Sequence, residues 1–214
     1  AALEAQGDRV RLAAALVNLG SVHMRAARIS LAQACYERGI ALHREVGNRF
    51  SLGSALGNLG AVYYEQGKTE VTLRLLQESL PESRAAGDRR SEATALSNLG
   101  LLLCDAGRFE EARPYFDEAL ALHRQVGDRR SECGALFGMG VLAYREGNLH
   151  EALERTQAAL VLAREMKNPT YIGGALGNIA DLSLELGDLD AAEAACLEAG
   201  DVLREAGLVM EQAK

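Results

Sequence analysis

The chain has 214 residues, of which 48% are hydrophobic and 25% are charged, and its formal net charge is -7. So many apolar residues, with only three prolines, exclude a disordered or collagen-like chain. The acidic balance argues against a nucleic acid or an anionic membrane as the partner, because both attract basic surfaces.

Targeting and metal-binding signals are also missing from the sequence. No apolar run approaches the roughly 18 residues of a membrane-spanning helix, and the first residues lack the basic and then apolar pattern of a secretion signal. We therefore expect a cytoplasmic protein. The cysteines stand too far apart for a zinc site, so we expect reduced, buried thiols and neither a metal nor a cofactor; they are Cys35, Cys104, Cys133 and Cys196.

A six-residue motif recurs every 40 residues along the chain. It reads ALVNLG from Ala15, ALGNLG from Ala55, ALSNLG from Ala95, ALFGMG from Ala135 and ALGNIA from Ala175. A fixed period of this length is typical of repeat arrays, which grow by stacking similar units rather than by enlarging one core. The length of the chain therefore indicates the number of repeats.

A glycine followed by Asp or Asn marks every repeat boundary except the one at Lys167–Asn168. Glycine favours the left-handed conformation that ends a helix, and the Asp or Asn side chain caps the next helix. Pro169 supports this register, because it directly follows Asn168 and proline is tolerated at the first helical position. The boundaries are Gly7–Asp8, Gly47–Asn48, Gly87–Asp88, Gly127–Asp128 and Lys167–Asn168, and Gly207 closes the last repeat.

A second set of glycines divides each repeat into a first helix, helix A, and a second, helix B. Apolar residues recur at intervals of three and four, and no stretch alternates with a period of two. The dividing residues are Ala27, Gly67, Gly107, Gly147 and Gly187. The sequence thus predicts an all-α fold of antiparallel helix pairs over residues 8–47, 48–87, 88–127, 128–167 and 168–207, with 1–7 ending a preceding helix B and 208–214 starting a further helix.

This pattern resembles the tetratricopeptide repeat (TPR), in the extended form found in kinesin light chains, Pins-like adaptors and bacterial signalling proteins. The matching residues in the third repeat are Leu96, Leu99, Gly100, Gly107, Ala112, Phe116 and Ala119. Leu16, Leu56, Leu96, Leu136 and Leu176 replace the family's frequent Trp, and a longer helix B replaces its closing Pro. The resemblance implies a right-handed superhelical solenoid whose helices A line a concave groove, and a peptide-binding or protein-binding adaptor or regulatory module of a signalling protein.

Glycines also stand inside helix A, where each costs about 1 kcal/mol relative to alanine. We expect them to let helix B approach closely, and the small residues expected opposite are Ala32, Ala112, Ala152 and Ala192. A phosphate-binding loop is excluded because it requires a strand before the glycines. The glycines concerned are Gly20, Gly60, Gly100 and Gly140.

An asparagine stands two residues before the packing glycine, or before Ala180, in four of the repeats. In proteins that the chain resembles, an Asn at this place hydrogen-bonds the backbone of an extended bound peptide, and a carboxamide can both donate and accept. A merely solvated Asn, or recent duplication of the repeat, is the alternative interpretation. Gly138 interrupts the ladder, whose members are Asn18, Asn58, Asn98 and Asn178.

Residues four before, three after and seven after each Asn share its helix face. Tyr64 and Tyr144 stand one residue before the charged rim of this face, and we favour a packing role for them over a ligand contact. The candidate groove residues are Asn18, Ser21, Arg25, Ser54, Asn58, Glu65, Thr94, Asn98, Leu101, Asp105, Arg145, Asn178, Asp181 and Glu185.

Charge is distributed unevenly over the repeats. The first repeat carries a net charge of +3 and the fifth a net charge of -7. Weak homo-oligomerisation through these ends is therefore one alternative function, and a small-molecule-sensing array of a transcriptional regulator is another. We expect no enzyme activity, because the sequence contains neither a nucleophile motif nor a metal-binding His pair at helical spacing.

One column holds the same residue in every repeat. It is an arginine in the last turn of helix B, where a cation interacts favourably with the exposed backbone carbonyls. We therefore expect a structural role for Arg44, Arg84, Arg124, Arg164 and Arg204.

Overall fold

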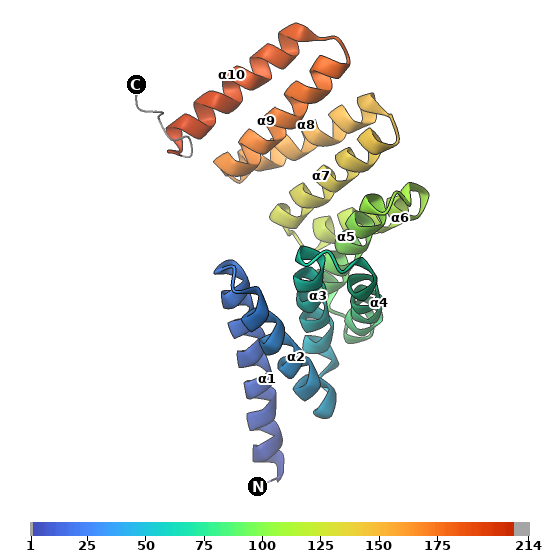
Figure 1. The fold of residues 1–214 in the computed structure, drawn as a ribbon, viewed down its shortest axis with the longest axis vertical. Helices are drawn as coiled ribbons and strands as arrows, with labels where there is room; N and C mark the ends of the chain where they lie inside the picture. Colours follow the sequence, from blue (N-terminus) through green and yellow to red (C-terminus); the bar gives the residue numbers. More distant parts are fainter. Residues whose placement is uncertain (1, 208–214) are drawn as a thin grey trace. The chain divides into compact units, whose positions relative to one another are not determined.

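A computed structural model describes the backbone of residues 2–207 and the side chains of residues 7–207. Every regular element in this part of the chain is an α-helix, so the predicted all-α class is confirmed (Figure 1). The helices are α1 (Ala2–Arg25), α2 (Ile29–Glu45), α3 (Arg49–Glu65), α4 (Thr69–Ala86), α5 (Arg89–Asp105), α6 (Phe109–Gln125), α7 (Arg129–Arg145), α8 (Leu149–Glu165), α9 (Pro169–Glu185) and α10 (Leu189–Glu205).

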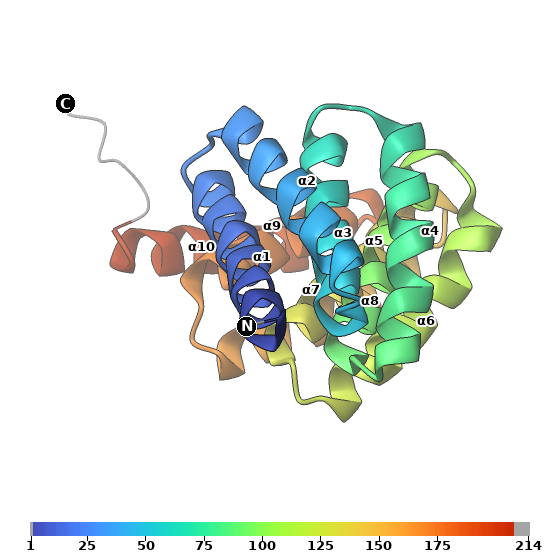
Figure 2. The same cartoon turned by 90° about the horizontal axis from the view of Figure 1, so that it is seen from below.

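Successive helices pack as pairs. Helix α1 packs on α2, α3 on α4, α7 on α8 and α9 on α10 (Figure 1 and Figure 2). Helix B of one pair also packs against helix A of the next, as α2 does on α3 and α8 on α9. The contacts divide the chain into two compact units between Leu102 and Leu103, within α5, and each unit has its own apolar core.

The predicted junctions between repeats have the expected local geometry. Gly47 adopts a φ of +68°, and the Asn48 side chain accepts a hydrogen bond from the Ser51 backbone N–H. Glycine relieves the strain of this left-handed conformation, and the cap satisfies one of the free N–H groups at the start of α3. Lys167 adopts a positive φ of 50° in the glycine column, and Asn168 caps α9.

The first junction differs from the prediction. Helix α1 runs without a break from Ala2 to Arg25, so Gly7 and Asp8 lie inside a helix. One glycine costs a helix only about 1 kcal/mol, which the hydrogen bonds of the continued turns offset. The prediction that residues 1–7 end a preceding helix is therefore wrong for residues 2–7. The further helix predicted at 208–214 lies outside the described residues.

Three glycines within helix A face helix B, and two of them, Gly20 and Gly140, leave little room for a side chain, as predicted, but the residue opposite is a different one. A Cβ atom added to Gly20 would lie 2.6 Å from Tyr36 Cε1. Gly60 likewise faces Leu76, and Gly140 faces Thr156. Tyr36 and Thr156 follow the predicted Ala32 and Ala152 by one helical turn, and all the predicted alanines are themselves buried. We refer to Tyr36, Leu76, Phe116 and Thr156, which are equivalent in the repeat, as the facing position.

Candidate functional site

The asparagine ladder lies on helices α1, α3, α5 and α9. Asn18 and Asn178 are exposed, and Asn58 and Asn98 are half-buried. Within the described residues, none of the four carboxamides forms a hydrogen bond to a side chain or to the backbone. Their donors and acceptors are therefore available to a ligand.

Three candidate hydroxyls on the same face are partly used by their own helices. Ser21 Oγ donates to the Val17 carbonyl at 3.2 Å, and Ser54 Oγ donates to the Ser51 carbonyl at 3.1 Å. Thr94 Oγ1 donates to its helix in the same way. Because a hydroxyl has one hydrogen, these groups can only accept a hydrogen bond from a ligand while these bonds persist.

Three candidate residues meet in a pocket between α7, α8 and α9, with a volume of about 340 Å³. They are Asn178, Asp181 and Glu185, all from α9. We call this hollow the acidic pocket. Its other walls include Phe137, Gly140, Val141, Tyr144, Thr156 and Leu182.

Two further candidates, Asn98 and Leu101, line a smaller hollow of about 60 Å³ between α3, α4 and α5. We call it the apolar pocket. It lies at the same place in its repeats as the acidic pocket, because Asn98 corresponds to Asn178 and Leu101 to Asp181. The remaining walls are Gly60, Ala61, Tyr64, Thr72 and Leu76.

Both tyrosines line these pockets. Tyr64 is 38% exposed and Tyr144 is 44% exposed, and each lines the pocket of its own unit. Tyr144 donates from its hydroxyl to Glu185 Oε1 at 2.7 Å, and this hydrogen bond raises the pKa of the hydroxyl. The packing role that we ranked first and the ligand contact that we ranked second both stay predictions.

The facing position explains why the hollows differ in size. The ring of Phe116 lies against Gly138, where an added Cβ would come within 2.5 Å of Cε1. An asparagine at 138 would meet this ring, which accounts for the gap in the ladder. Leu76 leaves the small apolar pocket and Thr156 the larger acidic one. Comparing this column among the repeats could have revealed Thr156 as a pocket residue.

The remaining charged candidates do not line these two pockets. Arg25, Glu65 and Asp105 are exposed at the ends of α1, α3 and α5. Arg145 lines a separate, open hollow together with Arg113 and other residues.

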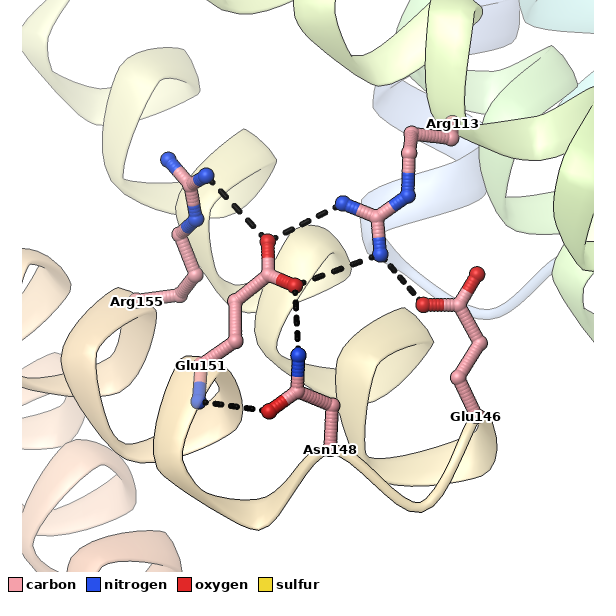
Figure 3. Close-up of polar contacts among 5 residues, drawn as sticks. All are labelled: Arg113, Glu146, Asn148, Glu151 and Arg155. Atoms are coloured by element: carbon pink, nitrogen blue, oxygen red, sulfur yellow. Dashed lines mark hydrogen bonds and ion pairs between the residues drawn. The ribbon is translucent and has the colours of Figure 1, made fainter.

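Figure 3 shows a network of ion pairs and hydrogen bonds, of which two members, Arg113 and Glu146, also line that open hollow. Arg113 Nη1 donates to Glu151 Oε1 at 3.0 Å, and its Nη2 pairs with Glu146. Asn148 and Arg155 donate to the same Glu151 carboxylate at 3.2 Å. The hydrogen bond from Arg113 is the main reason why the pKa of Glu151 is lowered. Because its carboxylates are paired internally, we interpret the network as a structural junction.

Other chemistry finds little support in the described part of the chain. No group of His, Cys, Asp and Glu side chains there could hold a metal ion, and no helix there is long and apolar enough to cross a membrane. Cys133 is buried, which raises the pKa of its thiol to about 11. Cys196 is exposed, so the prediction of uniformly buried cysteines is wrong.

Solved structures share the fold of the chain at low sequence identity. BtubC (BKLC) from P. vanneervenii matches at 18% identity with a TM-score of 0.73, over 100% of this chain and 96% of its own. A Podosopora anserina protein assigned as a kinesin light chain with nearly identical TPR-like repeats matches at 12% identity and a TM-score of 0.73, over 94% and 98%.

A third structure is the Rap conjugation gene regulator of plasmid pLS20 in complex with a Phr peptide. It matches at 16% identity with a TM-score of 0.72, over 90% of this chain and 53% of its own, so the chain spans about half of that protein. No curated protein sequence matches the chain.

Family models agree with the structural likeness. A model described as tetratricopeptide repeat matches residues 11–81 and 91–165, and another of the same description matches residues 174–199. The predicted solenoid fold class is confirmed by these matches together with the solved structures. The chain therefore belongs to the tetratricopeptide repeat family.

Proposed function

We propose that the helix A face binds an extended peptide segment of a partner protein, and that the chain acts as an interaction scaffold without chemistry of its own. The observation that carries this proposal is the pair of equivalent pockets. Each combines an asparagine with an exposed tyrosine, as Asn98 does with Tyr64 and Asn178 with Tyr144.

The chemistry of these residues suits an extended backbone. A carboxamide offers one acceptor and two donors, which match the N–H and C=O groups of a peptide. Tyrosine adds apolar contact area with a polar end and is enriched at protein interfaces. Pockets beside such groups can take the peptide's side chains and so provide specificity.

A solved neighbour supports the same function. The Rap regulator, which has this fold, is in complex with a peptide. A scaffold of this kind suits an adaptor or a regulatory module of a larger signalling protein, the role that we propose for the chain.

A selection of short random peptides displayed on phage tests the proposal. We would select against the parent chain and against the double variant Asn98→Ala, Asn178→Ala. The matched control is Gln77→Ala, Gln157→Ala, which removes two exposed amides from helix B. Circular dichroism checks that all three proteins are folded.

We expect the parent and the control to enrich the same peptides, and the asparagine variant to bind them about tenfold more weakly. Equal binding to all three proteins would place the interaction elsewhere. Enrichment of no peptide by the parent would overturn the proposed function. Sedimentation at low and high salt would then test self-association through the charged ends.

A further inference from the structure

Thr156 gives the acidic pocket its size. At the facing position the first three repeats of this chain carry larger side chains, of which Phe116 lies against Gly138 and Tyr36 against Gly20. Thr156 is buried, and its Oγ1 donates to the Ala152 carbonyl at 2.8 Å, so its only hydroxyl hydrogen is used within α8. A short side chain opposite Gly140 thus leaves a hollow deep enough for a long side chain of a ligand.

The pocket changes in polarity from its buried end to its mouth. Leu182 is buried, and Phe137 and Val141 contribute further apolar wall. At the exposed end stand the carboxylates of Asp181 and Glu185. This gradient matches a side chain that has an apolar stem and a charged head.

The two carboxylates are set to receive a cation. Asp181 and Glu185 are one turn apart on the same face of α9, and Tyr144 holds Glu185 through Oε1. Glu185 Oε2 forms no hydrogen bond, and Asp181 no ion pair, with any other described residue. Two such acceptors one turn apart attract a guanidinium or ammonium group more strongly than a single carboxylate does.

No cation of the chain itself lines this pocket, as far as its described residues show. Neither lysine nor arginine is among the lining residues, and Arg145 lines the neighbouring open hollow instead. The fifth repeat has eight acidic residues and one basic residue, Arg204, which pairs with Asp201. The apolar pocket lacks this chemistry, because Leu101 stands there in place of Asp181.

We propose that the acidic pocket receives an arginine or lysine side chain of the bound segment, with arginine preferred. The stem lies along Phe137 and Val141, and the head lies between Asp181 and Glu185. Arginine is favoured because its planar fork can bind a carboxylate through two nitrogens and stack on an aromatic ring such as that of Tyr144. This inference rests on the proposed peptide binding and names the residue that the pocket selects.

Other side chains fit the pocket less well. An aliphatic side chain would fill the apolar part but would desolvate the carboxylates without a partner. An acidic side chain would be repelled by both carboxylates. The pocket therefore discriminates by charge as well as by length.

The test uses a peptide selected by the parent chain and three synthetic forms of it. The basic residue is kept as arginine, replaced by citrulline, which is a neutral group of the same shape, or replaced by alanine. Calorimetry measures the affinity of each form for the parent and for the double variant Asp181→Asn, Glu185→Gln. We expect citrulline to weaken binding to the parent about tenfold and to leave binding to the variant nearly unchanged.

Two further variants distinguish binding of the basic side chain in the pocket from general attraction by the negative charge of the fifth repeat. The control Asp190→Asn, Glu193→Gln changes the net charge of the fifth repeat equally on α10, at exposed positions outside the pocket. We expect it to keep the preference for arginine. Thr156→Leu narrows the pocket with the side chain that Leu76 places at the facing position, where it lines the smaller apolar pocket together with Asn98, and we expect it to abolish the preference while the protein stays folded.

The outcomes distinguish this inference from the proposed function. Selected peptides without a recurring basic residue, or an arginine preference that survives Asp181→Asn, Glu185→Gln, would overturn the pocket assignment and leave peptide binding intact. If the α10 control lost the preference for arginine as fully as the pocket variant, net charge alone would explain the attraction, and the pocket assignment would also be wrong. Selection of no peptide would overturn both proposals.

Discussion

Arg84 donates from Nε to Glu92 Oε1 at 2.8 Å and so joins the last turns of α4 to the first turn of α5. Arg89 donates to the other oxygen of the same carboxylate at 2.9 Å. The Glu92 side chain is only 2% exposed, whereas both arginines keep about half of their surface in water. A buried carboxylate is thus neutralised by two cations that remain solvated.

The arginine column therefore acts differently from our expectation. We predicted that these cations would interact with the carbonyls at the end of helix B. The structure instead pairs Arg124 with the buried Glu132, in the same way as Arg84 pairs with Glu92. Arg44 and Arg164 reach Glu78 and Glu198 on helix B of the following repeat. Four of the five arginines thus connect adjacent repeats within their compact unit, whereas Arg204 pairs with Asp201 in its own helix.

Removing the buried carboxylate should destabilise the protein. We expect Glu92→Ala to lower the free energy of unfolding by about 1–2 kcal/mol, because two hydrogen-bonded ion pairs and some packing are lost. The loss stays moderate because the freed Arg84 and Arg89 are already solvated. Glu92→Leu should cost less, since Leu52 is buried at the equivalent position. Urea unfolding followed by circular dichroism measures both variants.

The exposed pair of Arg108 and Glu111 provides a control for this prediction. Glu111→Ala removes a carboxylate that is 57% exposed and should change the unfolding free energy less than Glu92→Ala does. If the two alanine variants were equally stable, the buried carboxylate would contribute no more to the unfolding free energy than the exposed one, and this prediction would be wrong.

Two glycines one turn apart on α7 should respond in opposite ways to alanine. Nothing lies within 4 Å of a Cβ at Gly134, whereas a Cβ at Gly138 would be 2.5 Å from the Phe116 ring. We expect Gly134→Ala to stabilise the protein by about 0.5–1 kcal/mol through helix propensity. Gly138→Ala should destabilise it by about 1–3 kcal/mol through overpacking. Thermal unfolding of the two variants compares them, and a stabilising Gly138→Ala would contradict the packing of Phe116.

The sequence predicted where the helices end better than it predicted which residues of neighbouring helices contact each other. The pair Gly47–Asn48 specifies a helix end and a cap within two residues, so its conformation follows from the sequence. The partner of Gly20 depends on how α2 lies against α1, and spacing alone selected Ala32 instead of Tyr36. Gly7 shows the limit of the local signal, because the same glycine and aspartate lie inside a continuous helix.

The sequence predicted which site residues share a face of one helix, but not the pocket that this face forms with other helices. Asn178, Asp181 and Glu185 share a face because of the helical period, and the structure brings them to one pocket. The pocket itself depends on Thr156 in another helix, which the face of α9 does not reveal. Glu92 was missed as a buried residue because a charged residue in a polar stretch normally predicts exposure.

His43 should make the stability of the protein depend on pH. Its side chain is 1% exposed, neither ring nitrogen has a hydrogen-bond partner in the described part of the chain, and burial lowers its pKa from 6.5. The unfolded state therefore takes up a proton at higher pH than the folded state does. The contribution of neutral His43 is complete above about pH 6.5 and is lost as the pH falls towards and through the lowered pKa.

The variant His43→Leu isolates this contribution, because leucine does not titrate. We expect the parent to lose more unfolding free energy than the variant between about pH 7.5 and about pH 5.5, as measured by urea unfolding at both values. All other ionisable groups are the same in the two proteins and so cancel in the comparison. Identical losses in the two proteins would show that protonation of His43 does not oppose folding.

The network in Figure 3 predicts that arginine at position 113 cannot be replaced by lysine without loss. Arg113 binds both oxygens of Glu151 and also Glu146, and its side chain is 34% exposed. A lysine keeps the charge but has one nitrogen, which cannot reproduce this fork. We expect Arg113→Lys to lower the unfolding free energy by about 1 kcal/mol and Arg113→Ala by somewhat more.

Arg108 supplies the matched control, since it also binds a carboxylate through two nitrogens but within its own helix end and at higher exposure. Arg108→Lys should therefore cost less than Arg113→Lys in the same urea titration. The hydrogen bonds of Arg113 join α6 to Glu146, which follows α7, and to Glu151 in α8. Their loss should therefore weaken the packing between repeats rather than one helix. If Arg113→Lys matched the parent, charge alone rather than the fork of hydrogen bonds would hold this junction together.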